Sequence, residues 1–188
     1  MTPDAILETL KQEFGDALTE VEVKGPEVWA TTTPATSRAV CQRLRELGFE
    51  YLNCLSGADW RTHLEVVYDL SSLREPAKVH LRVKVSREAP VVPTVSDLWR
   101  AADWHERECY DLFGVRFDGH PDHRRILLPE DWVGYPLRKD YADERLVPYT
   151  DYGAEEKVAK AEARPAPKPA AAPAAPPPAP PKPEGTPS

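Results

Sequence analysis

The sequence has few cysteines and no long apolar run. Its three cysteines, Cys41, Cys54 and Cys109, are widely spaced and form no Cys-x-x-Cys pair, so reduced thiols are favoured over a cysteine-ligated zinc or iron–sulfur centre. No stretch approaches the roughly 18–20 apolar residues that cross a bilayer. The opening MTPDAILETLKQEF lacks the pattern of a signal peptide. We therefore expect a chain of a reducing compartment that does not itself enter the membrane.

Excess positive charge and phosphate-binding motifs are also missing. The chain has 24 Lys and Arg against 31 Asp and Glu, a formal net charge of -7, which argues against a nucleic-acid footprint. Neither GxGxxG nor GxxxxGK followed by Ser or Thr occurs, so no nucleotide site is indicated. The hydrophobic residues amount to 41% and include five tryptophans, which is enough for a core.

Residues 1–92 are predicted to form an α+β domain of two layers. Helices are expected over 2–15 and 33–48, because each stretch begins with Thr-Pro and ends at a glycine. TEVEVK and EVWATT predict a strand pair, and three more strands are expected near 50–56, 62–70 and 77–87. The last two alternate apolar with charged residues, which predicts an antiparallel sheet with helices on one face.

Residues 93–153 are predicted to be a helical segment followed by an extended C-terminal arm. Thr94 with Asp97, and Asp103 with Glu106, have the spacing of capping boxes, so two short helices are expected to meet near Asp103. The stretch that follows Gly114 is rich in Gly, Pro and Asp, with one strand-like piece, RRILLP. From residue 154 onward, 11 of the 21 prolines occur without an aromatic residue. The sequence therefore predicts a disordered Pro/Ala-rich tail over 154–188.

The stretch ERECYDLFG, residues 106–114, places acids, a base and a thiol on one predicted helix. At about 100° per residue, Trp104, Arg107, Glu108 and Asp111 share one face, which predicts an exposed acid stripe. Glu108 and Asp111 have the spacing of a catalytic acid/base pair. Arg107, four residues before Asp111, favours an ion pair instead, and that is the interpretation we prefer.

A metal site is the alternative that the histidines leave open. HEREC lacks the second histidine of the HExxH zinc motif. His105 and Cys109 at i and i+4, with His120 and His123 in the next loop, are nevertheless candidate ligands of a free-standing metallohydrolase. A half-buried histidine and a buried cysteine that pack against the domain are the simpler interpretation, which we favour.

The arm mixes cationic with aromatic side chains. The members are Arg124, Arg125, Arg138 and Lys139, interleaved with Trp132, Tyr135 and Tyr141. Such mixtures on irregular backbone are typical of protein–protein contact surfaces. The alternative is that the arm folds onto its own domain and pairs its charges there, and residue spacing alone favours neither.

Residues 106–141 resemble the signature of the 30-kDa subunit, also called the C subunit, of respiratory complex I, the proton-pumping NADH:quinone oxidoreductase. The similarity is carried by ERECYDLFGVRF, GHPDHRRILLPEDW and GYPLRKDY, and it runs without a gap. One departure is His123, where the family usually has an apolar residue.

The resemblance implies a non-catalytic structural and assembly subunit of the hydrophilic arm of the complex, supporting electron transfer from NADH to quinone coupled to proton translocation. It implies no cofactor in this chain, with flavin and iron–sulfur clusters in other subunits. The expected partners are the large subunit that helps form the quinone site and neighbouring iron–sulfur subunits, with no nucleic acid. The expected location is peripheral, on the cytoplasmic side of the bacterial inner membrane, with membrane contact only through the complex. The same module resembles components of membrane-bound hydrogenase and formate-hydrogenlyase complexes, an alternative that the neighbouring subunits would decide.

The resemblance also implies no catalytic and no metal-binding residue in this chain. The candidates for partner-interface or structural ion pairs are Glu106, Arg107, Glu108, Asp111, His120, Arg124, Arg125, Arg138, Lys139 and Asp140. Arginine offers carboxylates a planar fork of donors. We therefore expect Arg124, Arg125 and Arg138 to form charge-assisted bonds that lose their water only when the partner docks.

Overall fold

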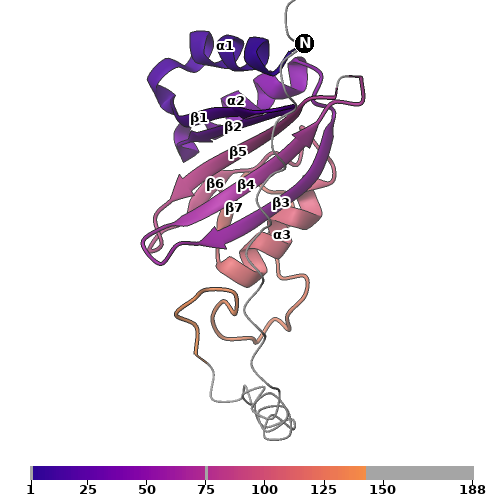
Figure 1. Ribbon diagram of the computed structural model, residues 1–188. Helices are drawn as coiled ribbons and strands as arrows, with labels where there is room; N and C mark the ends of the chain where they lie inside the picture. The colour runs from indigo at the N-terminus through magenta and orange to yellow at the C-terminus, as the bar shows by residue number, and fades with distance from the viewer. Residues whose placement is uncertain (1, 75, 143–188) are drawn as a thin grey trace, which may run out of the picture. The chain divides into compact units, whose positions relative to one another are not determined.

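A computed structural model describes residues 2–74 and 76–142, and these residues form the elements labelled in Figure 1. In chain order they are α1 (Pro3–Phe14), a 3-10 turn (Gly15–Ala17), β1 (Leu18–Lys24), β2 (Glu27–Thr32), α2 (Pro34–Glu46), β3 (Tyr51–Asp59), β4 (Leu64–Ser71), β5 (Lys78–Val85), β6 (Val91–Pro93), α3 (Ala102–Phe113) and β7 (Arg116–Asp118). The predicted α+β class is confirmed. The predicted tail, and residues 143–153 of the predicted arm, lie outside the described residues.

The first two helices begin at the predicted Thr-Pro pairs and end at or just before the predicted glycines. Thr2 caps α1 by accepting the N–H of Ala5 at 3.3 Å, and a proline occupies the first turn of both helices. Gly15 follows α1 with φ of 47°, and Gly48 follows α2 with φ of 94°. Such left-handed backbone suits glycine, so each glycine lets the chain leave its helix and enter the next strand.

The main sheet has the strand order β1-β2-β5-β4-β3, and it is mixed rather than purely antiparallel. All neighbours pair antiparallel except β2 and β5, which pair parallel from Glu27↔Lys78 to Thr32↔Val83. The reason is the path of the chain. The connection through α2 places β3 at the far edge of the sheet, where it runs parallel to β2. The chain then reverses into β4 and reverses again into β5, so β5 runs in the same direction as β2. Because β5 comes to lie beside β2, the pair must be parallel.

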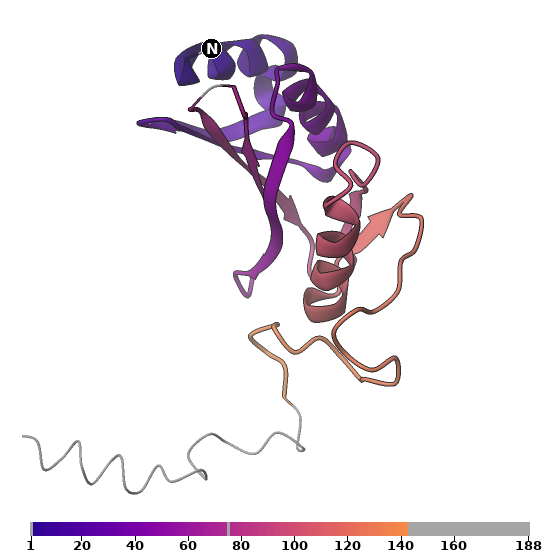
Figure 2. The same ribbon diagram turned by 90° about the vertical axis from the view of Figure 1, so that its right-hand side faces the viewer.

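One face of the sheet carries the core. The predicted alternation is confirmed in β4, where Leu64, Val66, Tyr68 and Leu70 are fully buried, and β5 repeats the pattern. In Figure 2, α2 and α3 lie on the same side of the sheet, and this side holds the apolar residues. The other face carries cross-strand pairs of charged and titratable residues, with Glu65 opposite Lys84 and Asp69 opposite His80. Only one face of the sheet is therefore sealed by helices of the described chain.

Only one of the two helices expected around Asp103 forms. Residues 96–101 form no helix, and α3 starts at Ala102 without a side-chain cap. The prediction was wrong because the capping-box residues bind elsewhere. The Asp97 carboxylate accepts hydrogen bonds from both terminal nitrogens of Arg38 on α2, at 2.9 and 2.6 Å. Glu106 accepts the hydroxyl of Thr94 rather than capping α3 itself.

The segment after α3 is irregular. β7 pairs with β6 as a short parallel ribbon, and residues 119–142 contain no helix or strand. The strand expected at RRILLP is absent from this described stretch, because the N–H groups of residues 126–128 bond to a side chain instead of a neighbouring strand. Val92, Val95 and Phe117 join the same core as β4 and β5. The described part of the predicted second segment thus shares the hydrophobic core of the first.

Candidate functional site

The helix α3 lies against β3, and this contact sets the direction of its acidic side chains. Gly57 of β3 leaves room for Phe113, since a Cβ on that glycine would stand 2.5 Å from the phenyl ring. Glu106 and Asp111 are both 0% exposed. The expected exposed acid stripe is therefore wrong for Asp111, and Arg107 on the same predicted face is buried too, whereas Glu108 and Trp104 do face solvent. A small residue on the sheet allows α3 to approach closely and to bury its carboxylates.

Asp111 is the first of two carboxylates that hold the arm. One of its oxygens accepts the N–H groups of Ile126, Leu127 and Leu128 at 3.1, 2.7 and 2.8 Å, and the other accepts Arg125 at 2.6 Å. Burial alone raises the pKa of Asp111, but the hydrogen bonds from these amides and the guanidinium outweigh it and hold the pKa below its usual value. The side chain is thus an ionised acceptor for backbone that no strand supports.

Arg125 is bound within its own chain. Besides Asp111, it donates to the carbonyl oxygens of Trp132 at 2.9 Å and Gly134 at 3.3 Å, and its side chain is 13% exposed. The expectation that Arg125 loses its water only on docking is therefore wrong. The expected pair between Arg107 and Asp111 is also not the one formed. Arg107 donates to the carbonyls of Arg124 and Arg125 and lies 3.7 Å from Asp122.

Asp59, at the end of β3, is the second carboxylate that holds the arm. It accepts the N–H of Arg61 at 2.7 Å, the N–H of Lys139 at 2.8 Å and the guanidinium of Arg87. Burial works to raise the pKa of Asp59, yet the bonds from these two amides and from Arg87 lower it overall. Arg87 also donates to Asp140 at 2.6 Å. Sequence reasoning missed Asp59 and Arg87, because their arm partners lie 80 and 53 residues away.

Arg138 and Tyr135 fasten the arm to the end of α3. The Nε of Arg138 donates to the carbonyl of Phe113 at 2.7 Å, and its guanidinium lies 4.9 Å from the centre of the Tyr135 ring. That ring packs on Gly114, where an added Cβ would stand 2.5 Å from it and where φ is 75°. Both the backbone conformation and the contact therefore require glycine at this position.

Glu106 ties the start of α3 to the preceding loop. It accepts the hydroxyl of Thr94 at 2.6 Å and the N–H of Val95 at 2.7 Å, and His120 lies 3.8 Å away. Burial raises the pKa of Glu106 to about 7. The Nδ1 of His120 accepts the N–H of Asp122, so its Nε2 carries the proton that is donated to the Asp103 carbonyl at 3.2 Å. These contacts connect the loop before α3, the helix itself and the start of the arm.

The histidines and cysteines considered for a metal do not converge. The Nε2 of His123 accepts the N–H of Phe117 at 3.0 Å, and its ring packs on Tyr110 with centres 4.2 Å apart. Burial, with the neighbouring His120, lowers the pKa of His123. Cys109 is buried and His105 half-buried, as the simpler interpretation predicts. Among residues 2–74 and 76–142 no group of three His, Cys, Asp or Glu side chains is arranged to hold a metal ion.

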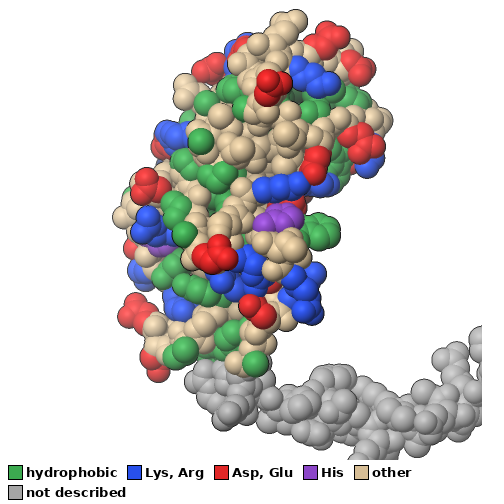
Figure 3. Space-filling model, turned by 90° about the vertical axis from the view of Figure 1, so that its left-hand side faces the viewer, with side chains coloured by type: hydrophobic (Ala, Val, Ile, Leu, Met, Phe, Trp, Pro, Cys, Tyr) green, Lys and Arg blue, Asp and Glu red, His purple; other side chains and the backbone are tan. Residues whose placement is uncertain are grey.

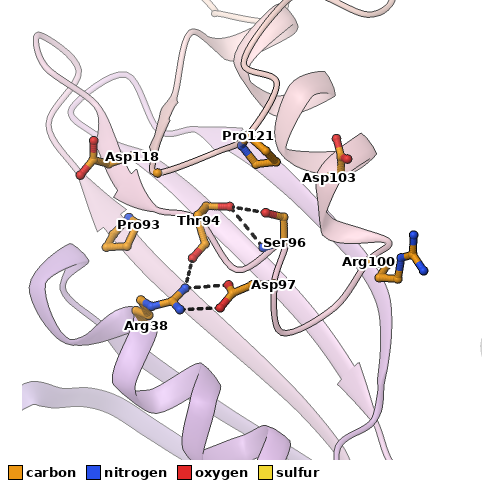
Figure 4. Close-up of a pocket in the computed structure, with 10 residues that line it drawn as sticks. Arg38, Pro93, Thr94, Ser96, Asp97, Arg100, Asp103, Asp118 and Pro121 are labelled. Carbon is orange, nitrogen blue, oxygen red and sulfur yellow. Dashed lines mark hydrogen bonds and ion pairs between the residues drawn. The ribbon is translucent and has the colours of Figure 1, made fainter.

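An open hollow of about 620 Å³ lies beside the Glu106 network (Figure 4). Arg38 reaches from α2 to Asp97 and to the carbonyl of Thr94, at 2.6 Å from the latter. Asp103, Asp118 and Arg100 complete the charged lining. The lining carries both basic and acidic side chains, and Arg38 and Asp97 are already paired with each other. The charges of the hollow therefore favour neither an anionic nor a cationic ligand.

The described arm leaves a set of apolar side chains in solvent. Leu127, Val133 and Leu137 are 61%, 76% and 51% exposed, and the side chain of Arg124 is 61% exposed beside Asp122. On the face drawn in Figure 3, acidic and basic side chains are interspersed with hydrophobic ones. We call Leu127, Val133 and Leu137 the arm surface. Each of these three large apolar side chains is more than half exposed, which makes the arm a candidate contact surface. No helix among the described residues is long and apolar enough to span a membrane.

Comparison with known proteins gives one consistent family. The family described as "Respiratory-chain NADH dehydrogenase, 30 Kd subunit" matches residues 30–145. The C subunit of NADH-quinone oxidoreductase from Chloroherpeton thalassium is 40% identical over 159 residues, which cover 74% of this chain and 63% of that protein. The C/D subunit of NADH-quinone oxidoreductase from Phocaeicola vulgatus is 52% identical over 102 residues, 53% of this chain and 19% of that protein. The chain thus spans less than two thirds of the length of these relatives.

A solved structure is similar over the same region. It is described as "Nqo5 of the trypsin-resistant fragment (1-134)" and superimposes with a TM-score of 0.57 at 32% sequence identity. The similarity covers 65% of this chain and 99% of that one. The α+β domain is therefore a shared fold.

Proposed function

The chain belongs to the family of the 30-kDa subunit of respiratory-chain NADH dehydrogenase, and from this premise we propose that it is a non-catalytic structural and assembly subunit of a membrane-bound NADH:quinone oxidoreductase. It binds the large subunit that helps form the quinone site, beside iron–sulfur subunits, on the cytoplasmic side of the membrane. It carries no cofactor itself and supports electron transfer from NADH to quinone, coupled to proton translocation, by holding its neighbours in place.

The observation that carries this proposal is the way the arm is built. Two buried carboxylates, Asp111 and Asp59, together accept five backbone N–H groups, four of them from the arm. An irregular segment that is fixed in this way loses little conformational freedom when a partner binds. It nevertheless leaves Leu127, Val133 and Leu137 in solvent. A rigid arm with exposed apolar side chains suits a docking surface, and none of the buried acids is open to a substrate.

The identity of the partner is supported by the relative whose name joins C and D in one protein. A fused protein keeps its two parts at high effective concentration, an advantage when they bind each other. We therefore propose the D part of that relative as the counterpart of the large partner. An equivalent subunit of a hydrogenase or formate-hydrogenlyase complex is the second candidate, and the same experiment separates the two.

Affinity purification of the tagged full-length chain from detergent-solubilised membranes tests the proposal. We expect the large subunit and the iron–sulfur subunits to be identified by mass spectrometry, with NADH:quinone activity in the same fraction. Hydrogenase subunits in their place would support the second candidate, and recovery of the chain alone would contradict both.

The arm surface can be tested in the same assay. Leu137→Glu places a charge where an apolar partner surface is expected, so recovery of the large subunit should fall at least tenfold. Leu73→Glu is the matched control, because Leu73 is 77% exposed and lies in the loop between β4 and β5, outside the arm. Equal recovery with both variants would contradict docking through the arm.

A further inference from the structure

The turn between β3 and β4 holds a tryptophan out into solvent. Trp60 is 56% exposed, yet its indole N–H donates to Glu65 at 2.9 Å. Glu65 is only 5% exposed, so the polar end of the indole is fixed against the sheet while its apolar part faces outward. An amphipathic ring in this position is typical of aromatic residues that anchor protein–protein contacts.

Several contacts keep this indole in one orientation. The second oxygen of Glu65 lies 3.2 Å from the Nε2 of His63, and the His63 ring lies nearly parallel to the indole at 14°. The backbone N–H of Trp60 donates to the His63 carbonyl at 3.0 Å. A large side chain that is already ordered loses little entropy on binding.

The turn and the arm are positioned by the same carboxylate. One oxygen of Asp59 accepts the N–H of Arg61 in the turn, and the other accepts the N–H of Lys139 in the arm. The Lys139 ammonium lies 5.9 Å from the centre of the Trp60 ring. Trp60 is therefore continuous with the arm, although 79 residues separate it from Lys139 in the sequence.

We propose that Trp60 is the aromatic anchor of the docking surface and enters an apolar pocket with a carboxylate rim on the large partner subunit. The inference rests on the proposed function and adds to it a residue outside the arm and the chemistry of the partner. Arg61, the next residue in the chain, and Lys139, whose ammonium lies near the ring, are exposed cations. Acidic side chains around the partner's pocket are their electrostatic complement.

Trp60→Ala in the tagged full-length chain, expressed in cells without the native copy, tests this anchor. The large subunit recovered per tagged chain from solubilised membranes should fall at least tenfold, because central aromatic anchors dominate binding. Trp104→Ala is the matched control, since Trp104 is a 63% exposed tryptophan on α3 and should retain recovery within about twofold. The melting temperature of each purified chain reports whether the fold is intact.

Hydroxyl-radical footprinting of the wild-type chain provides a readout that does not depend on the variant's folding. We expect oxidation of Trp60 to be at least tenfold slower in the assembled complex than in the free chain. Equal oxidation in both states would overturn the proposal. A second result would also overturn the proposal: slow oxidation of Trp60 in the free chain that becomes fast when the chain is truncated after Ala142. Residues 143–188 of this chain, and not the partner, would then cover Trp60.

The outcomes separate the anchor from the function on which it rests. If the wild-type chain recovers no large subunit, the proposed function fails and the anchor with it. If the wild-type chain and Trp60→Ala recover equal amounts, the proposed function stands and only the anchor is overturned.

Discussion

Replacing Asp111 by asparagine should release the arm from the domain. The amide oxygen of asparagine still accepts from the backbone N–H groups of residues 126–128. Its NH2 group, however, takes the place of the oxygen that lies 2.6 Å from Arg125. The substitution therefore keeps the shape of the side chain but removes the ion pair and sets a donor against a donor.

The free-energy cost of this substitution follows from the burial of Asp111 and Arg125. Asp111 is 0% exposed and the Arg125 side chain 13%, and removing one partner of a buried pair costs about 3–5 kcal/mol. Arg125 keeps its bonds to the carbonyls of Trp132 and Gly134, which places the cost at the lower end, about 3 kcal/mol. At about 1.4 kcal/mol per factor of ten, opening of the arm becomes roughly 100-fold more frequent.

Hydrogen exchange read by mass spectrometry measures this opening at the amides that bond to Asp111. We expect residues 126–128 to exchange roughly 100-fold faster in Asp111→Asn than in the wild-type chain. Glu108→Gln, an exposed carboxylate on the same helix, should change the free energy of opening by less than about 0.5 kcal/mol. Equal exchange in the two variants would refute the role given to Asp111.

Three further predictions concern the pH response, the glycine after α3 and the tail. A carboxyl whose pKa in the folded chain is raised from 4.5 to about 7 contributes stability below pH 4.5 that is lost as the pH rises through 7. In urea denaturation, the free energy of unfolding of the wild-type chain should therefore fall by about 3 kcal/mol between pH 5 and 8, and that of Glu106→Gln should not. Identical pH profiles of the two chains would contradict this. Gly114→Ala should speed trypsin cleavage at Arg124 and Arg125 by displacing Tyr135, whereas Gly25→Ala, also at positive φ but with no atom within 4 Å of its Cβ, should not; equal cleavage would show that the Tyr135 contact is unimportant. Deleting 154–188 should leave folding and assembly intact, and loss of the complex from membranes of the truncation strain would overturn that expectation.

The parts of the fold that sequence predicts are those encoded by neighbouring residues. The structure confirms the helix starts at Thr-Pro, the helix ends near glycine and the alternation of apolar residues in β4 and β5. Each of these signals depends only on residues a few positions apart. The parallel pairing of β2 with β5 joins residues 51 positions apart, from Glu27↔Lys78 onward. It depends on the path of the whole chain, so no local pattern shows it.

The sequence predicts the residues of the site better than their contacts. Asp111 is a candidate from its motif, but the motif places its binding partners on its own helix rather than in the arm. The error at Thr94 and Asp97 has a physical cause, because Ser, Thr, Asp and Glu satisfy any unpaired donor that the fold brings near. Asp59 carries no signal beyond an acid between two predicted strands, and its part in holding the arm depends on a residue 80 positions away.

Photo-crosslinking from Val133 in membranes tests most directly that the chain docks through its arm. A photoreactive residue at this position, which is 76% exposed, should form a crosslink that mass spectrometry assigns to the large subunit, while the same residue at Leu73 should form none. Crosslinks to the large subunit from Leu73 but not from Val133 would contradict the account, since the docking surface would then lie away from the arm.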